Sequence, residues 1–152
     1  MNCRIVFTEE YSHIAAIHDA LYSYNLNLTG FERSANVKAK ELPESAALVI
    51  IDDEGNFYGG IAFHWENDPR HIYVDYFFID DALRGQGWGY KVIDELVETA
   101  VAGNAENITL TTNTFQAPGF YRKCGFTEIG CKDAPTPLNP ENKHYTFRKD
   151  VQ

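Results

Sequence analysis

The segment Arg84-Gly85-Gln86-Gly87-Trp88-Gly89 decides how this chain is interpreted. A strand-like run, IYVDYFFI at 72–79, precedes it, and a helix-like run, VIDELVETAV at 92–101, follows it. Glycines let a backbone approach a phosphate closely, and a helix start directs free N–H groups and the positive end of its dipole toward the anion. Arg84 adds a cation. The segment therefore predicts a phosphate or pyrophosphate site.

Two common phosphate motifs do not fit this segment. A P-loop requires Gly-x-x-x-x-Gly-Lys-Ser/Thr, but Tyr90, Lys91 and Val92 follow Gly89. A dinucleotide fingerprint requires Gly-x-Gly-x-x-Gly, and position 90 is a tyrosine. The pattern that fits is Arg/Gln-x-x-Gly-x-Gly/Ala, so the chain resembles the GNAT superfamily of N-acetyltransferases, in which this loop binds the pyrophosphate of acetyl-CoA. The alternative is an ordinary glycine-rich turn before a helix.

A second motif, QAPGFYRKCGF at 116–126, agrees with the first. It resembles the family's Ala-x-x-x-Tyr-x-x-x-Gly-Phe segment, a short helix that ends in a glycine turn, and Gly125 suits that turn. The resemblance implies that Tyr121 lies near the CoA sulfur, where its phenol can protonate the departing thiolate. The alternative for Tyr121 is an aromatic side chain that only packs in the core or against CoA.

The resemblance also implies the residues that bind acetyl-CoA. The strand end at 77–79 offers backbone groups to the pantetheine arm, and backbone N–H groups there can polarise the thioester carbonyl. The pyrophosphate is expected on the N–H groups of residues 86–89. Thr114 stands where many relatives have an asparagine that faces CoA. The expected cofactor-binding residues are Phe77, Phe78, Ile79, Arg84, Gly85, Gln86, Gly87, Trp88, Gly89, Thr114, Ala117, Phe120 and Tyr121.

The general base is the least determined part of the site. A free alkylammonium has a pKa of about 10.4, so a base or a water chain must take its proton. Asp75 lies on the strand beside the cofactor and resembles an acidic residue that many relatives carry there, and Glu66 ends the preceding strand. Together with Tyr121, they are the predicted catalytic residues. Asp75 can equally be structural, Glu66 can be solvated hairpin charge, and His64 between apolar neighbours favours a structural strand residue.

Contacts to the acceptor are expected from segments that vary most freely around the cofactor. We predict Tyr24, Asn25, Phe31 and Trp65 as substrate-binding residues, and the proline-containing segment 133–142 as a further contact. The alternative for the aromatic residues is core packing. The net charge of −9 favours a cationic amine and argues against nucleic acid, which attracts clustered Lys and Arg.

Composition sets the remaining expectations. The 152 residues suggest a single domain, 1–152, with 44% apolar and 23% charged residues. No run is apolar and long enough for a membrane span, and there is no signal peptide. Three cysteines without metal-type spacing favour reduced thiols, a cytoplasmic location and no metal. A homodimer is a further expectation.

The patterns along the chain predict a mixed α/β fold, a largely antiparallel sheet flanked by helices in the order βα(α)βββαβαββ, which is the GNAT acyl-CoA N-acyltransferase order. The first helix is expected to start after an N-cap at Thr8 and to break within 25–30. The helix after the glycine loop should bury one face that includes Val92, Leu96 and Val101. Strands are expected near 3–7, 47–51, 57–65, 107–112, 126–130 and 143–148.

The leading function is an acetyl-CoA-dependent N-acetyltransferase that acetylates a primary amine of a small molecule by direct transfer in a ternary complex. Two alternatives differ in class or in acceptor: a catalytically silent acyl-CoA-binding sensor or interaction module, and a peptide or protein amine acetyltransferase. A covalent route through Cys124 is disfavoured because a helix C-terminus destabilises a thiolate.

Overall fold

The computed structural model describes residues 2–30, 38–116 and 118–152. Within these ranges, the elements in chain order are β1 (Cys3–Thr8), α1 (Tyr11–Thr29), β2 (Ser45–Asp52), β3 (Phe57–Glu66), β4 (His71–Ile79), η2 (Asp81–Leu83), α2 (Trp88–Ala102), β5 (Asn107–Asn113), η3 (Thr114–Gln116), α3 (Gly119–Lys123), β6 (Thr127–Asp133) and β7 (Lys143–Asp150).

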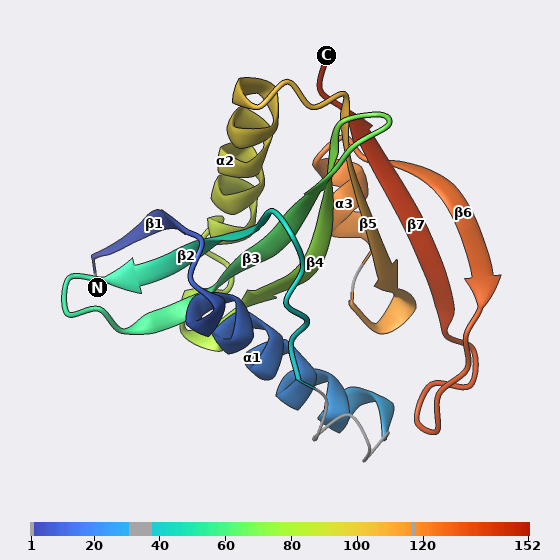
Figure 1. Cartoon of the computed structure of the whole chain (residues 1–152). Helices are drawn as coiled ribbons and strands as arrows, with labels where there is room; N and C mark the ends of the chain where they lie inside the picture. The colour runs from blue at the N-terminus through green and yellow to red at the C-terminus, as the bar shows by residue number, and fades with distance from the viewer. Residues whose placement is uncertain (1, 31–37, 117) are drawn as a thin grey trace.

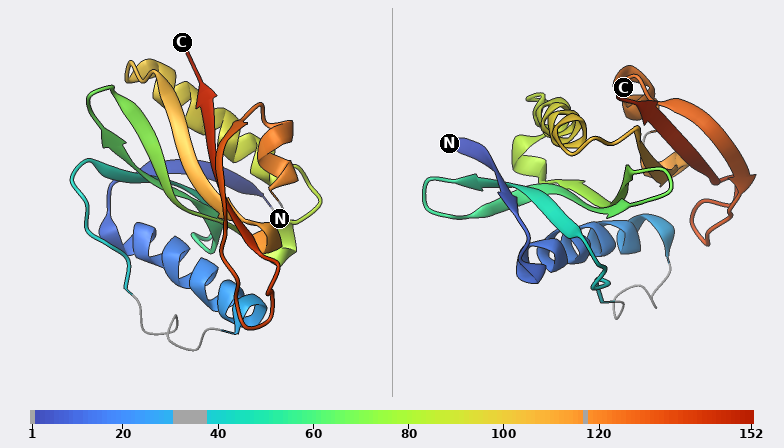
Figure 2. Two further views of the ribbon diagram at one scale, coloured as in Figure 1. Left: turned by 90° about the vertical axis from the view of Figure 1, so that its right-hand side faces the viewer. Right: turned by 45° about the horizontal axis from the view of Figure 1, so that its top comes forward.

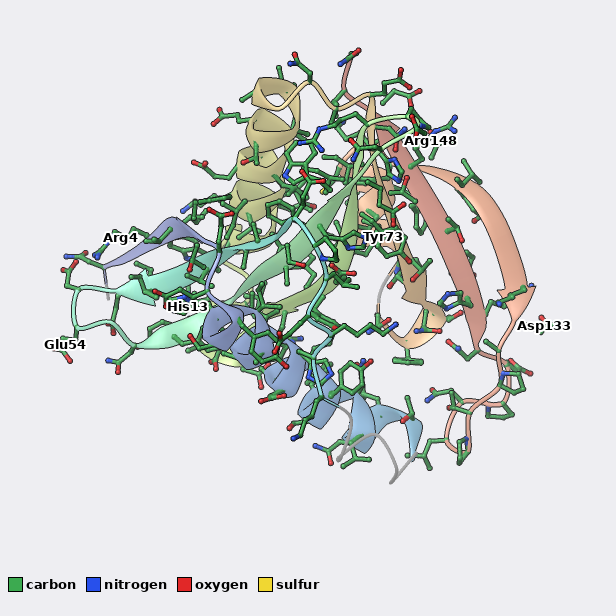
Figure 3. The ribbon with its side chains drawn as sticks, in the orientation of Figure 1. Arg4, His13, Glu54, Tyr73, Asp133 and Arg148 are labelled. Carbon is green, nitrogen blue, oxygen red and sulfur yellow. The ribbon has the colours of Figure 1, made fainter. Side chains whose placement is uncertain are left out.

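The strands form one sheet in the order β1-β2-β3-β4-β5-β7-β6 (Figure 1). Every neighbouring pair is antiparallel except β4 and β5, which are parallel. Helix α1 covers one face of the sheet, whereas α2 covers the other (Figure 2, right). Figure 3 labels Asp133, where β6 ends, and Arg148, near the end of β7. The expected mixed α/β fold with a largely antiparallel sheet is confirmed.

The parallel pair is short, and this shortness creates the space for the site. Pairing between β4 and β5 covers only His71–Tyr73 against Asn107–Thr109. Beyond Tyr73 the two strands diverge, as Figure 1 shows for the green and the yellow-brown arrows. Backbone N–H and C=O groups on the open edge of β4 therefore remain available for a ligand.

Two hydrophobic clusters attach the helices to the sheet. On the α2 face, Val92, Leu96 and Ala100 are fully buried in a cluster that includes residues of β2, β3, β4, β5 and β7. Burial of one such leucine stabilises the fold by about 1.5–3 kcal/mol. On the α1 face, Ile14 and Ile17 pack in a smaller cluster with side chains of β2 and β3. The predicted inward face of α2 is confirmed except for Val101, which is 52% exposed.

The predicted N-cap of α1 at Thr8 was wrong, whereas its predicted end within 25–30 is confirmed. Glu10 takes the N-cap position without a side-chain cap, while the hydroxyl of Thr8 accepts the N–H of Glu10 at 3.2 Å. At the other end the helix continues through Thr29, and Gly30 ends it with a φ of 78°.

The segment 133–142 holds the C-terminal end of this helix. Its Asn139 donates to the carbonyl of Leu28 at 2.6 Å, and the N–H of Leu138 donates to the carbonyl of Thr29 at 3.2 Å. Carbonyls in the last turn of a helix have no partner within the helix, so these two bonds stabilise that turn. The described part of the chain contains no helix with the length and apolarity that a bilayer crossing requires.

Candidate active site

The glycine loop and the start of α2 form an open cradle of backbone amides. Gly85 and Gly87 have φ angles of 76° and 79°, in the left-handed region that L side chains avoid. A Cβ atom at either position would meet nothing within 4 Å, so the space beside the loop is free. Lys91 makes the first helical backbone bond, to the carbonyl of Gly87. Among the described residues, the N–H groups before it therefore remain available to an anion.

Arg84 is held in place beside this cradle. Its Nε lies 2.8 Å from a carboxylate oxygen of Asp81 and 3.3 Å from the carbonyl oxygen of Ile79. Its guanidinium also stacks over the ring of Tyr24, 4.8 Å from the centroid, and donates to the Tyr24 hydroxyl at 3.3 Å. The guanidinium is thus oriented by residues of β4, η2 and α1. Gln86 folds back, and its amide donates to the carbonyl of Ala82.

An aromatic wall connects the loop to α3. A Cβ atom at Gly89 would meet the ring of Phe120 at 3.0 Å, so any larger residue would require this ring to shift. The Phe120 ring lies 5.9 Å from that of Phe77 and 5.0 Å from that of Tyr90. These residues line a cavity together with Arg84, Gly87 and Trp88, which we call the loop cavity. Two segments predicted to bind CoA, the glycine loop and the 120–121 pair, are therefore brought together.

A second cavity, the inner cavity, lies where β4 and β5 diverge. Phe77, Phe78 and Ile79 line it from β4, and Leu110 and Thr111 line it from β5. Tyr121 lines both the inner and the loop cavity. Burial raises the pKa of Tyr121, so its phenol keeps its proton at neutral pH. No hydrogen-bond partner for its hydroxyl is found within the described residues.

A β-bulge determines where Asp75 points. Ala62 pairs with Tyr76 and Phe63 pairs with Val74, so Asp75 is an extra residue in β4. Val74 packs in the cluster on the α2 face, whereas Tyr76 packs in the cluster on the α1 face. Asp75 lines the inner cavity beside Tyr76. The bulge therefore places the carboxylate at the cavity. Without it, the side chains of Val74 and Tyr76 would lie on the same face of the strand.

Asp75 belongs to a chain of hydrogen-bonded acid and base groups. Nδ1 of His64 lies 2.8 Å from Oδ2 of Asp75, and Nε2 of His64 lies 2.8 Å from Oε1 of Glu66. The other oxygen of Glu66 lies 3.3 Å from Nε2 of His71. The side chains of His64 and Asp75 are only 13% and 16% exposed, whereas that of Glu66 is 46% exposed. The chain thus runs from the cavity toward the surface.

Burial and charge act against each other in this group. Burial raises the pKa of Asp75, and the hydrogen bond and charge of His64 partly oppose that rise. Burial acts to lower the pKa of His64, but the hydrogen bonds and charges of Asp75 and Glu66 outweigh it and leave that pKa raised. A cavity-lining carboxylate whose pKa is shifted by burial and by a specific charged partner marks a candidate functional site, and Asp75 meets this description.

A third cavity, which we call the outer cavity, adjoins the inner one on the side of α1 and β7. It has its own lining from Tyr22, Asn113 and His144, and it shares Asp75, Asn25 and Gln116 with the inner cavity. Burial lowers the pKa of His144, so this imidazole is neutral at neutral pH. Among the described lining residues, Asp75 is the only carboxylate and neither lysine nor arginine occurs.

Several predicted residues lie elsewhere. Tyr24 and Asn25 line the inner cavity, but Trp65 is not brought to any of the three cavities and packs on Gly103 and under Arg70. Trp65 faces α2 because its neighbours His64 and Glu66 occupy the opposite face of the strand. Thr114 bonds to Asn142 and Lys143 at the start of β7. The predictions for Phe31 and Ala117 fall on residues outside the described ranges.

Two residues that the structure brings to the site were not among the predicted site residues. His64 was interpreted as structural, although His64 and Glu66 lie two residues apart, a spacing that places both on one face of a strand. Gln116 accepts from the N–H and the side chain of Asn113 and donates to Asn25 at 3.4 Å. No local signal indicates that bond, because Gln116 and Asn25 lie 91 positions apart.

Comparison with known proteins agrees with this geometry. The profile of the acetyltransferase (GNAT) family matches residues 11–126. The acetyltransferase Atu2258 of Agrobacterium fabrum is 28% identical over 115 residues, which are 76% of each chain. The peptidyl-lysine N-acetyltransferase YjaB of Salmonella typhimurium is 36% identical over 89 residues, which are 59% of this chain and 55% of that protein.

A solved structure is similar over most of the chain. The crystal structure of an acetyltransferase from Bacillus cereus superimposes with a TM-score of 0.63 and 27% identity, and the match covers 84% of each chain. The described residues contain no cluster of His, Cys, Asp and Glu that could hold a metal ion. The family match covers the glycine loop, the β4 strand and Tyr121 together, so the chain belongs to the GNAT family and is an acetyl-CoA-dependent acetyltransferase.

Proposed function

We propose that this enzyme acetylates a primary amine of a small molecule by direct transfer within a ternary complex. The observation that carries the proposal is the position of Asp75 and Tyr121 in one cavity. Both line the inner cavity, which adjoins the loop cavity through Tyr121 and the outer cavity through Asp75. A buried acid and a buried carboxylate thus stand between the cofactor side and the acceptor side, as acyl transfer requires.

The residues of the loop cavity fit acetyl-CoA. The free amides of 86–89, the open space beside Gly85 and Gly87, and the oriented guanidinium of Arg84 suit a pyrophosphate. The open edge of β4 at Phe77 to Ile79 suits the pantetheine arm. Acetyl-CoA supplies an activated thioester carbonyl when it is bound there.

Two side chains handle the protons in this proposal. The carboxylate of Asp75 accepts the proton of the acceptor ammonium, so that the neutral amine can attack. Tyr121 keeps its phenolic proton for the sulfur atom that departs, because burial raises its pKa. This proposal requires an ionised Asp75 beside a protonated Tyr121, which is the arrangement that acid–base catalysis needs.

Direct transfer is favoured over a covalent cysteine route. Burial raises the pKa of Cys124 to about 11, so the thiol stays protonated at neutral pH. Cys124 also does not line the inner cavity, whereas Tyr121 does. The nucleophile is then the acceptor amine itself.

The charges of the outer cavity support a cationic acceptor. A single carboxylate, Asp75, stands among aromatic and amide side chains, and His144 is neutral. Aromatic faces and a carboxylate attract an ammonium group. The net charge of −9 acts in the same direction over longer distances. A peptidyl lysine is a second candidate acceptor, because YjaB, a peptidyl-lysine N-acetyltransferase by name, is 36% identical over 89 residues.

A panel of amines tests the proposal. We expect release of free CoA thiol with small cationic amines, a lower kcat/KM for an acetylatable lysine peptide, and no loss of activity with a chelator. Added salt should lower kcat/KM, since screening weakens the attraction of a cation. CoA binding without turnover of any amine would favour the catalytically silent sensor. A better kcat/KM for the peptide would support the second candidate.

Substitution of Gly87 tests the cradle. Gly87→Val should weaken CoA binding in calorimetry by at least tenfold, because the side chain occupies the space where the phosphate approaches the backbone. Gly55→Val is a matched control, since Gly55 has a φ of 82° and equally open surroundings, in the turn beside Glu54 (Figure 3). Both variants should lose similar stability, about 1–2 kcal/mol for a left-handed residue. Equal CoA affinity for both would contradict the assignment of the loop.

Location and assembly are further parts of the proposal. A cytoplasmic location is supported by three free cysteines in the structure, a state that reducing compartments maintain. A homodimer is supported only by the exposed edge strand β6, which offers unpaired backbone groups. Sedimentation at several concentrations tests the second point.

A further inference from the structure

We propose that His64 and Glu66 are positioning residues for Asp75. In this arrangement Glu66 holds the imidazolium of His64, and the imidazolium fixes one oxygen of Asp75 and keeps the buried carboxylate ionised. The second oxygen of Asp75 then remains free for the acceptor ammonium. The inference rests on the proposed function of Asp75 as the general base and extends it to two residues of β3.

The hydrogen-bond geometry determines the charge of His64. Both ring nitrogens lie 2.8 Å from a carboxylate oxygen, one of Asp75 and one of Glu66. With both carboxylates ionised, each can only accept a hydrogen bond, so both ring nitrogens carry a proton. His64 is therefore an imidazolium between two anions, and each bond is charge-assisted.

The geometry also determines which oxygen of Asp75 is free. Oδ2 accepts from His64, whereas Oδ1 has no hydrogen-bond partner among the described residues. Because Asp75 lines both the inner and the outer cavity, the carboxylate group stands at the junction where an acceptor amine would enter. A carboxylate held by one oxygen keeps a constant direction, and positioning of this kind is what a general base requires.

Glu66 is in turn held by His71, on the side away from His64. Nε2 of His71 lies 3.3 Å from Oε2 of Glu66, and Nδ1 of His71 donates to the carbonyl of Pro69 at 2.8 Å. Glu66 is half exposed and does not line the inner or the outer cavity, so it acts through His64 rather than on a substrate. The sequence-based expectation that Glu66 itself is a catalytic base is replaced here by a positioning role.

The remaining titratable groups nearby leave this charge balance intact. Tyr73, labelled in Figure 3, has its ring 5.6 Å from that of His64. Lys40, from the segment before β2, adds a positive charge that favours the ionised form of Asp75. Tyr22, Tyr76 and His144 line the outer cavity with Asp75, and the imidazole of His144 is neutral at neutral pH. His64 is thus the cation in direct hydrogen-bond contact with the Asp75 carboxylate.

NMR titration of the free enzyme tests the arrangement without any acceptor. The carboxyl carbon of Asp75 and the ring carbons of His64 report the two pKa values directly. We expect the pKa of His64 to fall in Glu66→Gln, because one of the two anions is removed. We expect the pKa of Asp75 to rise in His64→Gln, because glutamine can donate a hydrogen bond but carries no charge. His13→Gln is the matched control, since His13 bonds to Thr8 beside Glu10 at the start of α1, away from Tyr73 (Figure 3).

Kinetics then tests whether the arrangement serves the base. In His64→Gln the acid limb of kcat/KM should move to higher pH. Below the limb, kcat/KM should be lower than in the parent by about tenfold or more, and the KM for acetyl-CoA should be unchanged. Glu66→Gln, an exposed substitution that should fold, is expected to move the limb less than His64→Gln does, because the charge of Glu66 itself raises the pKa of Asp75 and its loss opposes the loss of its hold on His64. If the pKa of the Asp75 carboxyl does not change in His64→Gln, the proposal is overturned. It is also overturned if that pKa changes while the acid limb of kcat/KM does not. If the parent enzyme acetylates no amine, the proposed function fails, and the positioning role fails with it even if the titrations show the ion cluster.

Discussion

Replacement of Tyr121 by phenylalanine is expected to lower kcat by about 10²–10⁴-fold, the usual contribution of a general acid. The ring is buried between those of Phe126 and Phe147, with centroid distances of 5.9 and 6.0 Å, and phenylalanine keeps these contacts. CoA affinity and the free energy of unfolding should therefore change little. Steady-state kinetics with calorimetry for CoA measures both effects.

A matched control separates the acid role from packing. Tyr145→Phe removes a hydroxyl from a half-buried ring that stacks on Phe147 at 6.0 Å but does not line the inner cavity. We expect parent-like kcat for this variant. Moreover, Tyr121→Phe should slow most those acetyl thioesters whose thiol leaving group has a higher pKa, since these thiols depend most on protonation as they depart. An unchanged kcat in Tyr121→Phe would return this residue to a packing role.

Replacement of Asp75 by asparagine should have the second large effect, a fall of about 10²–10⁴-fold in kcat/KM for the acceptor amine. Asparagine has nearly the same shape and retains an oxygen for the His64 bond, but it cannot accept the ammonium proton. The KM for acetyl-CoA should remain near that of the parent. Asp52→Asn is a suitable control, because Asp52 is also a hydrogen-bonded carboxylate, bound to Asn56 and Tyr58 in the β2–β3 hairpin.

The pH dependence of kcat/KM is a second test of Asp75 as the general base. The base must be ionised, and burial raises the pKa of Asp75. In the parent, kcat/KM should therefore be fully present above that raised pKa and be lost as the pH falls through it. In Asp75→Asn this acid limb should disappear, and a remaining limb at alkaline pH would belong to the amine. A plateau of parent height in Asp75→Asn would show that the carboxylate is structural.

The sequence by itself determined the features that depend on a few neighbouring residues. The positive φ angles of Gly85 and Gly87, the start of α2 after them and the Gly125 turn after α3 all follow from local backbone chemistry. The buried face of α2 follows from its apolar spacing, apart from Val101. These features were sufficient to predict the cofactor loop, Tyr121 and the fold class.

Segments whose partners are distant in sequence were predicted less well. The end of α1 within 25–30 was predicted, but the bonds that Asn139 and Leu138 make to its last carbonyls, from more than a hundred positions away, were not. Trp65 was assigned to the acceptor side, although the pleat of β3 directs it to Gly103 on the α2 face. Local patterns contain no information on either contact.

Only the tertiary structure decided where the side chain of Asp75 lies. Counting alternate positions along β4 cannot orient this side chain, because the bulge opposite Ala62 and Phe63 inserts one residue into the register. The same register brings His64 within 2.8 Å of Asp75, and the divergence of β4 from β5 opens the cavity that the carboxylate lines. Strand pairing is set by the packing of the entire sheet rather than by the residues that face the cavity. The sequence therefore sufficed to predict the glycine loop and to name Asp75 as a candidate base, but not the contact between Asp75 and His64 or the cavity that Asp75 lines.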